Sequence, residues 1–241
     1  MRYAGSKERI ADRIHTAIRE NTPDGVDTYV EPFVGGCGSM CKAEYPNRIG
    51  ADSNEYMVAF WQAIQSGWVP PEAIGRDLYD SLKANPQDHP KELVGFAGSG
   101  VSFGGKWFGG HLKTSASDAS RNYAAESSRS AVRQAARIIG VHFVHSDYSE
   151  LEIPSGSIVY CDPPYADTIR YKEEFHSQAF WRWAKAKAKA DAGCYVFVSE
   201  YSAPDFARCI LEIQHKTTMD RNTASTRIEK LYALSLAGAK S

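Results

Sequence analysis

Hydrophobic residues recur with two alternating periods in the first and last thirds of the chain. Over residues 7–20, Ile10, Ile14, Ala17 and Ile18 have the three- and four-residue spacing of a helix face, and a second helix is predicted over 54–66. Short apolar runs that end in turn residues or acids predict strands over 26–31, 48–52, 141–146, 157–162 and 194–199. A final hairpin is predicted over 210–215 and 228–236. Strands that alternate with helices in this way indicate an α/β sheet.

The middle of the chain, residues 68–140, breaks this alternation. Prolines are followed by a glycine and aromatic stretch over 103–110 and then by a predicted helix over 120–139. We therefore expect residues 1–67 and 141–241 to form one sheet-bearing domain, with 68–140 as a small, mainly helical insertion packed beside it. The Ala and Lys run over 184–190 is predicted to be a solvated helix end.

The composition predicts a globular, intracellular protein without a structural metal. The 241 residues, 43% hydrophobic and 24% charged, suffice for a sizeable core. No apolar run approaches the roughly 18 residues of a membrane span, and the first residues lack the apolar core of a secretory signal. The five cysteines are odd in number and scattered, with no Cys-x-x-Cys pair, so we expect buried thiols.

The net charge of −1 neither favours nor excludes nucleic acid, because binding depends on where the charge lies. Residues 101–137 hold six basic and two acidic side chains, a local excess of four. A solvated helix face explains such a run more often than DNA does, so alone it is weak evidence. The basic residues are Lys106, Lys113, Arg121, Arg129, Arg133 and Arg137, and the acidic ones are Asp118 and Glu126.

A strand, a glycine-rich turn and a helix start are predicted over 28–39, which is typical of a nucleotide-derived cofactor site. Asp52 follows Glu31 by about twenty residues, at the end of the next strand, where an acid typically binds ribose hydroxyls. The pyrophosphate motif G-x-G-x-x-G is absent. Because Glu31 would repel a diphosphate but suit a cationic amino acid end, the turn favours S-adenosylmethionine over NAD.

Asp147 and Tyr148 close the third predicted strand. An acid and an aromatic ring together can accept from an adenine amino group and cover its face. Without the other motifs, a strand-end cap with a packing tyrosine would be about equally probable.

The most specific signal is Val159-Tyr160-Cys161-Asp162-Pro163-Pro164-Tyr165, a hydrophobic strand that ends in an acid and two prolines. The prolines fix φ and have no amide hydrogen to compete for backbone acceptors. The carboxylate of Asp162 and the carbonyl of Pro163 can therefore accept from one NH₂ group, and Tyr165 offers a face for stacking. This suits an exocyclic amine on a base that has left its duplex. Cys161 should face away from Asp162 within the strand.

Together these motifs resemble the Dam-like D12 class, α group, of N6-adenine-specific DNA methyltransferases in its bacterial and phage forms. The likeness covers nearly the whole chain and follows the α order of cofactor motifs, insertion and catalytic motif. Ser6 stands where glycine is usual, and Cys37 where glycine often sits. The motifs that carry it are 3–7 (an aromatic-Ala-Gly-Gly-Lys type of cofactor motif), the turn at 31–39, Asp52-Ser53-Asn54, Asp147-Tyr148, the tetrapeptide at 162–165, and the segments 197–204 and 227–232.

The resemblance implies a Rossmann-like class I S-adenosylmethionine-dependent methyltransferase sheet, with 68–140 as the target-recognition insertion. It implies site-specific methylation at N6 of a flipped adenine in duplex DNA. Asp162, Pro163, Pro164 and Tyr165 would be catalytic. The implied cofactor contacts are Tyr3, Ala4, Gly5, Lys7, Glu31, Pro32, Phe33, Gly35, Gly36, Gly38, Asp52, Asp147, Tyr148 and Asp162.

The expected partner is double-stranded DNA, with no membrane and no metal, and the chain is expected to be a monomer or weak dimer in the cytoplasm of a bacterial or phage-infected cell. Basic side chains would hold phosphates, and an aromatic or amide group would reach the bases. The expected DNA contacts are Lys7, Arg9, Lys106, Trp107, Lys113, Arg121, Asn122, Arg129, Arg170, Tyr171 and Lys172. Core packing explains aromatics such as Trp107 and Phe108 about as often.

Three other functions stay open at this point. Methylation of N4 of cytosine or of adenine in RNA uses the same chemistry, although Asp at the head of the tetrapeptide and the α order favour adenine in DNA. A catalytically silent DNA-binding or cofactor-sensing module is disfavoured by the intact Asp162 and Tyr165. An NAD-dependent dehydrogenase is disfavoured by the glycine-rich turn.

Overall fold

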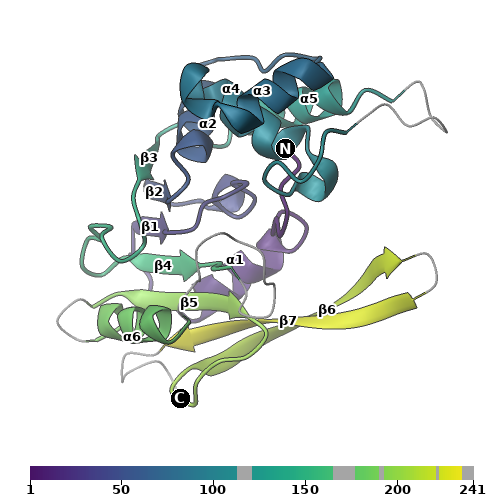
Figure 1. Cartoon of the computed structure of the whole chain (residues 1–241). Helices are drawn as coiled ribbons and strands as arrows, with labels where there is room; N and C mark the ends of the chain where they lie inside the picture. Colours follow the sequence, from purple (N-terminus) through teal and green to yellow (C-terminus); the bar gives the residue numbers. More distant parts are fainter. Residues whose placement is uncertain (113–120, 165–176, 190–192, 221–222, 235–241) are drawn as a thin grey trace.

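A single twisted sheet organises the chain (Figure 1), in a computed structural model that describes residues 1–112, 121–164, 177–189, 193–220 and 223–234. Within these residues the strand order is β3-β2-β1-β4-β5-β7-β6. The first five strands pair in parallel and β7 is antiparallel to both β5 and β6. The predicted α/β fold is therefore confirmed. The strands are β1 (Thr28–Glu31), β2 (Asn47–Asp52), β3 (Val141–His145), β4 (Ile158–Cys161), β5 (Tyr195–Glu200), β6 (Arg208–Asp220) and β7 (Thr223–Leu234).

The sheet is buried on both faces, which explains the nearly continuous apolar runs of its central strands. Successive residues of β4 point to opposite sides, so Tyr160 joins one apolar cluster while Val159 and Cys161 join the other. Helices α1 (Ala11–Glu20) and α2 (Glu55–Gln65) contribute to the first cluster, and α6 (Ser177–Lys187) covers the second face.

The insertion is helical in its described part and shares its core with the sheet domain. Helix α4 packs so closely on α2 that a side chain at Gly95 would overlap the carbonyl group of Tyr56. Leu82, Val94 and Phe96 belong to the same apolar cluster as the sheet residues. The division into two domains stays a prediction. The remaining helices are α3 (Arg76–Ala84), α4 (Lys91–Gly95), α5 (Tyr123–Ala135) and the short turns η1 (Met40–Lys42), η2 (Pro86–Asp88), η3 (Phe96–Gly100) and η4 (Phe103–Gly105).

Two local expectations differ from the structure. The final hairpin is longer than its apolar segments, because β6 and β7 continue their backbone pairing through polar residues. The Ala and Lys run at the end of α6 was predicted to be solvated, but one side of it is buried. Ala184 and Ala188, four positions apart, are buried against the sheet, whereas Lys185 is exposed.

Helix α3 offers a matched pair of leucines to test the shared core. Leu82 is fully buried in the common cluster and Leu78 is 38% exposed. Leu82→Ala should lower the free energy of unfolding by ~2–5 kcal/mol, whereas Leu78→Ala should change it by no more than about 0.5 kcal/mol. Thermal unfolding followed by calorimetry should give one transition in both variants. Two separate transitions, with only one moved by Leu82→Ala, would show that the insertion folds independently.

Candidate active site

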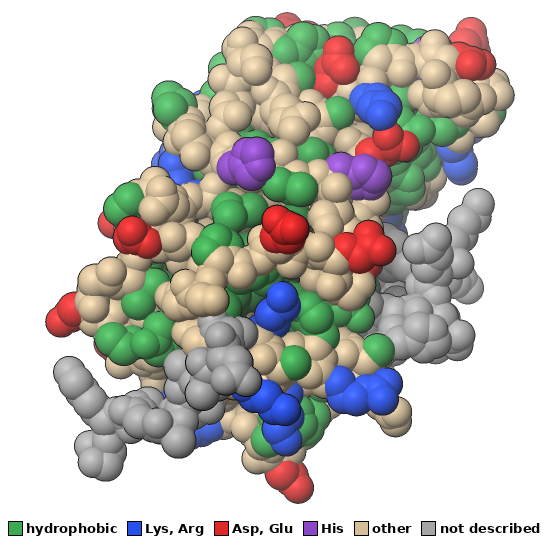
Figure 2. Space-filling view, turned by 90° about the vertical axis from the view of Figure 1, so that its left-hand side faces the viewer, with side chains coloured by type: hydrophobic (Ala, Val, Ile, Leu, Met, Phe, Trp, Pro, Cys, Tyr) green, Lys and Arg blue, Asp and Glu red, His purple; other side chains and the backbone are tan. Residues whose placement is uncertain are grey.

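Four acidic residues lie where neighbouring parallel strands end. Glu31 is the last residue of β1 and Asp52 the last of β2, while Asp147 and Asp162 follow β3 and β4 closely. Because the carboxyl ends of parallel strands meet at one edge, the topology gathers these acids there. The arrowheads of β4 and β5 place this edge on the right of Figure 1. Figure 2 shows the opposite side, where acidic and basic side chains are interspersed among apolar and polar ones.

The N-terminal strap, residues 1–7, crosses the glycine-rich turn at this edge. A side chain at Gly35 or Gly36 would overlap Tyr3, and one at Gly38 would come within 2.7 Å of the Ser6 hydroxyl. The strap is fixed from the insertion as well, since the amide of Ala4 donates to the carbonyl of Gly105 at 3.0 Å. In the structure these glycines therefore make room for the strap.

Lys7 joins the strap to the predicted catalytic acid. Its Nζ lies 2.7 Å from Oδ1 and 2.8 Å from Oδ2 of Asp162, and 3.2 Å from Oε1 of Glu229 on β7. Burial would lower the pKa of Lys7, but the two carboxylates outweigh it and the pKa is raised. Its side chain is only 6% exposed. The structure thus places the ammonium inside the site, away from the surface where a DNA phosphate would bind.

Glu31 is held in a buried polar chain that sequence reasoning missed. The hydroxyl of Tyr29 donates to Oε1 of Glu31 at 2.7 Å and lies 3.0 Å from Oγ of Ser39, which in turn lies 3.1 Å from Nε2 of His15. Burial raises the pKa of Glu31 to about 8, and the charge of Asp162 adds to this rise. Burial lowers the pKa of His15 to about 4. Near neutral pH both groups are therefore largely uncharged.

Asp52 is oriented by two backbone amides, one in the glycine-rich turn and one at the start of α2. Its Oδ2 accepts from Gly35 N at 2.8 Å and its Oδ1 from Asn54 N at 2.9 Å. Asn54 caps α2 by accepting from the amide of Tyr56 at 3.1 Å. Burial raises the pKa of Asp52, and the hydrogen bonds from the two amides only partly offset this rise. The acidic side chain is thus fixed at the strand end where a ribose contact was predicted.

An aromatic wall stands beside Asp147. The ring of Tyr148 lies 5.3 Å from that of Phe33, 5.7 Å from that of Phe180 and 5.1 Å from that of Trp183. Tyr148 and Phe33 were predicted cofactor contacts, whereas the two residues of α6 were not. The indole N–H of Trp183 is buried and has no hydrogen-bond partner within the described residues.

The predicted catalytic motif leaves the sheet directly after β4. Cys161 is fully buried in the cluster beneath α6, and burial raises the pKa of its thiol, so it is an inert packing residue. Asp162 lies toward Lys7, as the alternation of the strand predicts. Pro163 is buried, which fixes the turn, and Pro164 is half-buried. Tyr165 lies outside the described residues.

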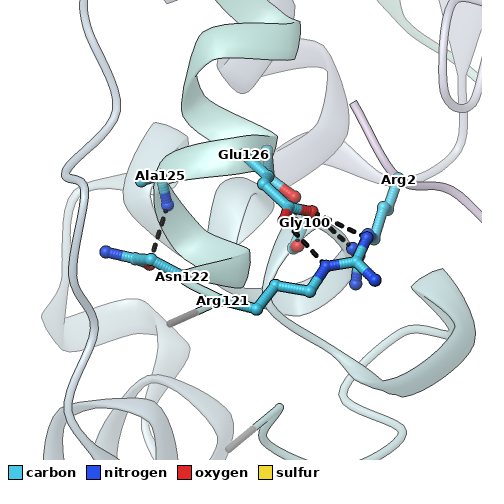
Figure 3. A network of polar contacts seen from close by, with 7 residues as sticks. Arg2, Gly100, Arg121, Asn122, Ala125 and Glu126 are labelled. Atoms are coloured by element: carbon cyan, nitrogen blue, oxygen red, sulfur yellow. Dashed lines mark hydrogen bonds and ion pairs between the residues drawn. The ribbon is translucent and has the colours of Figure 1, made fainter. Parts of the chain in front are cut away.

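Basic side chains near the start of α5 form the polar contacts drawn in Figure 3. Arg2 and Arg121 both pair with Glu126, at 2.9 and 2.8 Å, and their guanidinium groups lie 4.4 and 5.0 Å from the ring of Tyr123. Asn122 caps α5 by accepting from the amide of Ala125 at 3.0 Å. Arg121 and the Asn122 oxygen are thus engaged within the protein in this structure.

Other predicted DNA contacts have varied surroundings. Lys106 and Arg9 are exposed. Arg129 is exposed too, and with Arg2 and Arg133 it lines a surface hollow of about 430 Å³. Trp107 packs against Tyr56, with ring centres 6.1 Å apart. This contact favours the core-packing interpretation of Trp107. Lys113, Arg170, Tyr171 and Lys172 lie outside the described residues.

The described residues hold no group of three or more His, Cys, Asp or Glu side chains that could bind a metal ion. Among these same residues, no helix has both the length and the apolar character needed to cross a membrane.

The buried Glu31 should make the cofactor-free protein less stable as pH rises. Its carboxyl keeps a proton in the folded state up to about pH 8, whereas the unfolded chain loses it near 4.5. Between these values the folded state binds more protons, so stability falls with rising pH. From pH 6.5 to 8 the loss from this group is about 2 kcal/mol, and Glu31→Gln should abolish it. In the folded state His15 stays neutral over this window, while its unfolded imidazole, with an ordinary pKa of 6.5, adds a smaller change of opposite sign that is the same in both proteins.

The measurement is urea unfolding of both proteins at pH 6.5 and 8. An equal change of unfolding free energy in wild type and Glu31→Gln would show that Glu31 is ionised in the folded protein.

Comparison with known proteins relates the first part of the chain to one family. Residues 3–93 match the family described as D12 class N6 adenine-specific DNA methyltransferase. This segment contains the strap, the glycine-rich turn and Asp52, and it is less than half of the chain. No curated protein matches the chain significantly.

Two solved structures resemble the chain as a whole. One is a protein from Listeria monocytogenes provisionally assigned as a class I S-adenosylmethionine-dependent methyltransferase, with 11% identity, a TM-score of 0.45 and coverage of 98% of this chain and 62% of the other. The second is SMU.472, provisionally assigned as a methyltransferase and complexed with SAH, with 10% identity, a TM-score of 0.37 and coverage of 98% and 54%. The chain thus spans little more than half the length of these proteins.

At this level of similarity the two structures add nothing to the strand order described above. The family match is the more informative finding, because it falls on the motifs that build one half of the site. Residues 3–93 carry the match to D12 class N6 adenine-specific DNA methyltransferases, and this supports the predicted family, cofactor and activity.

Proposed function

We propose that the chain transfers the methyl group of S-adenosylmethionine to N6 of adenine in duplex DNA. The observation that carries this proposal is the position of Asp162 and its two prolines, at the end of β4 and beside the acid at the end of β1. The family match over residues 3–93 agrees with it. The order of cofactor motifs, insertion and catalytic motif further favours the Dam-like α group, of bacterial or phage type.

The residues at the sheet edge fit the proposed cofactor. Glu31 and Asp52 provide acids for a cationic amino acid end and for ribose hydroxyls respectively. Tyr148 and Phe33 provide an apolar face for an adenine ring, and Asp147 an acceptor for its amino group. The unpartnered indole N–H of Trp183 is a buried donor beside the same face. A diphosphate is disfavoured at the end of β1, because Glu31 would repel it once ionised.

The chain's own residues then position the reacting amine. When bound, the cofactor supplies an electrophilic methyl group on a sulfonium. Asp162 and the carbonyl of Pro163 accept the two N6 hydrogens, which turns the nitrogen lone pair out of the ring and toward the methyl group. Tyr165 stacks on the extruded base. Orientation of the two reactants supplies much of the rate, and no residue needs to form a covalent bond.

The insertion, residues 68–140, is proposed to bind the target DNA. Exposed Lys106 and Arg129 carry charges suited to phosphates, and the hollow beside Arg129 is lined by two further arginines. The oligomeric state proposed is a monomer or weak dimer, in the cytoplasm of a bacterial or phage-infected cell.

The catalytic proposal is tested by transfer of a labelled methyl group to unmethylated DNA, followed by mass analysis of the digested nucleosides. We expect N6-methyladenine with wild type. Asp162→Ala should lower kcat at least ~100-fold because the positioned acceptor is lost, and Asp162→Asn should do so because it removes the negative charge and replaces one acceptor oxygen with an NH₂ donor. Cofactor affinity, measured by calorimetry, shows whether the variants remain folded and bind.

Asp27→Ala is the matched control, since Asp27 is an exposed acid just before β1, at the opposite edge of the sheet. It should retain full activity. Label in cytosine or only in RNA would instead support the related methyltransferase classes, and cofactor binding without any transfer would support a silent module.

Removal of single charges should identify phosphate contacts on the insertion. Lys106→Ala and Arg129→Ala should each weaken DNA binding at any sequence and reduce the slope of log K against log salt by about one. Fluorescence anisotropy at several salt concentrations measures both. Arg182→Ala, on α6, removes an exposed charge from another part of the surface and should leave the slope unchanged. Equal slopes in all four proteins would argue against this surface as the DNA contact.

A further inference from the structure

Lys7 ties three separate parts of the fold to one point. It extends from the N-terminal strap and contacts Asp162 after β4 at 2.7 Å and Glu229 on β7 at 3.2 Å. It also donates to the carbonyl of Gly5 at 3.0 Å, so its three hydrogens have acceptors. Glu229 is 13% exposed and Asp162 21%. One ammonium therefore faces two carboxylates in a largely buried place, and the group carries a net charge of −1.

We propose that Lys7 and Glu229 are positioning residues that set the charge and orientation of Asp162 for the target adenine. This rests on the proposed function. The ammonium holds the carboxylate of Asp162 ionised and fixed. Glu229 gives the ammonium a second partner, so that a lobe of Asp162 can accept from the substrate amine without leaving a buried cation unpaired.

The reaction itself needs the negative excess that Glu229 provides. N6 of adenine donates its lone pair to the methyl carbon, the carbon–sulfur bond breaks, and sulfur keeps that electron pair and becomes neutral. One positive charge thereby moves to N6, which then loses a proton to water. A lone Lys7 beside Asp162 would oppose a cation at N6. With Glu229 the net charge of the group is −1 and favours it.

Of the other groups near Asp162, Glu31 on β1 is the one whose pKa lies close to neutral, at about 8 in the cofactor-free protein, and it is unchanged in all the variants compared. Tyr160 on β4 lies 2.8 Å from the Ser199 hydroxyl of β5, and burial raises its pKa well above the ordinary value. At the end of β5, Glu200 accepts from the amide of Tyr201. The buried thiol of Cys161 likewise stays protonated.

The test is the pH dependence of kcat, at saturating cofactor and DNA, in Lys7→Met and Glu229→Gln. Without the cation, the carboxylate protonates more readily, so the acid limb of Lys7→Met should move up by about one pH unit. Without Glu229, the cation acts on Asp162 alone, so the limb of Glu229→Gln should move down. Its maximal kcat should fall about tenfold, with the cofactor KM unchanged within about twofold. Lys7→Arg should restore the wild-type limb.

Glu212→Gln is the matched control, because Glu212 pairs with Lys230 at 3.1 Å on the same hairpin. It should leave both the limb and kcat unchanged. Limbs that move in the same direction, or that stay in place in both variants, would overturn the proposal. So would a Lys7→Met variant that changes only the cofactor KM, since Lys7 would then be a cofactor ligand.

A second readout does not depend on turnover. The carboxyl carbon of Asp162, labelled with carbon-13 and assigned by its loss in Asp162→Asn, can be titrated by NMR in the same variants. Opposite shifts of its midpoint support the charge arrangement even if wild type transfers no methyl group, in which case only the proposed function fails. Absence of opposite shifts overturns the inference whether or not the enzyme is active.

Discussion

The contact between Lys7 and Asp162 joins residues 155 positions apart, and the rest of the site is arranged around it. For the ammonium to reach the end of β4, the strap must cross the glycine-rich turn in close contact. That crossing requires Gly35, Gly36 and Gly38 to lack side chains where the strap lies. This edge of the sheet is therefore covered by the chain's own first residues, and the insertion supports them through Gly105.

Two residues that depart from the motifs the chain resembles differ in their structural cost. Ser6 stands in a backbone conformation that any residue can adopt, since only Cys37 and Phe108 among the described non-glycine residues have positive φ. Its hydroxyl occupies the space left by the missing side chain of Gly38, so Ser6 causes no steric overlap. Cys37 has a φ of 58°, in the left-handed region where glycine is favoured. The fully buried thiol packs in the core there, so the chain accepts backbone strain of roughly 1 kcal/mol for that packing.

Much of the fold could be predicted from the sequence, because local patterns determine it. The strands were recognised by their apolar runs, and the acids by their places at the ends of those runs. Helices α3 and α4 were missed because their buried positions face a neighbouring helix rather than the sheet, within short segments rich in polar residues and prolines. Glu229 lies in the segment 227–232, one of those that carry the resemblance, but its contact with Lys7 was missed because the two residues are far apart in sequence. Trp183 was missed because its contacts also join distant residues, and nothing near it along the chain signals them.

The electrostatics of the edge follow from depth of burial. Acids end neighbouring strands, and if all were ionised they would repel one another strongly in this buried setting. The structure relieves this in two different ways. Glu31, which is fully buried, keeps its proton near neutral pH and has a neutral hydrogen-bond partner, whereas Asp162 is paired with the ammonium of Lys7. A cationic group that enters beside Glu31 would favour its ionised form, so the site is prepared to become more negative as a cation arrives. That property distinguishes this edge from a phosphate-binding one, where glycine amides and a helix N-terminus would meet an anion.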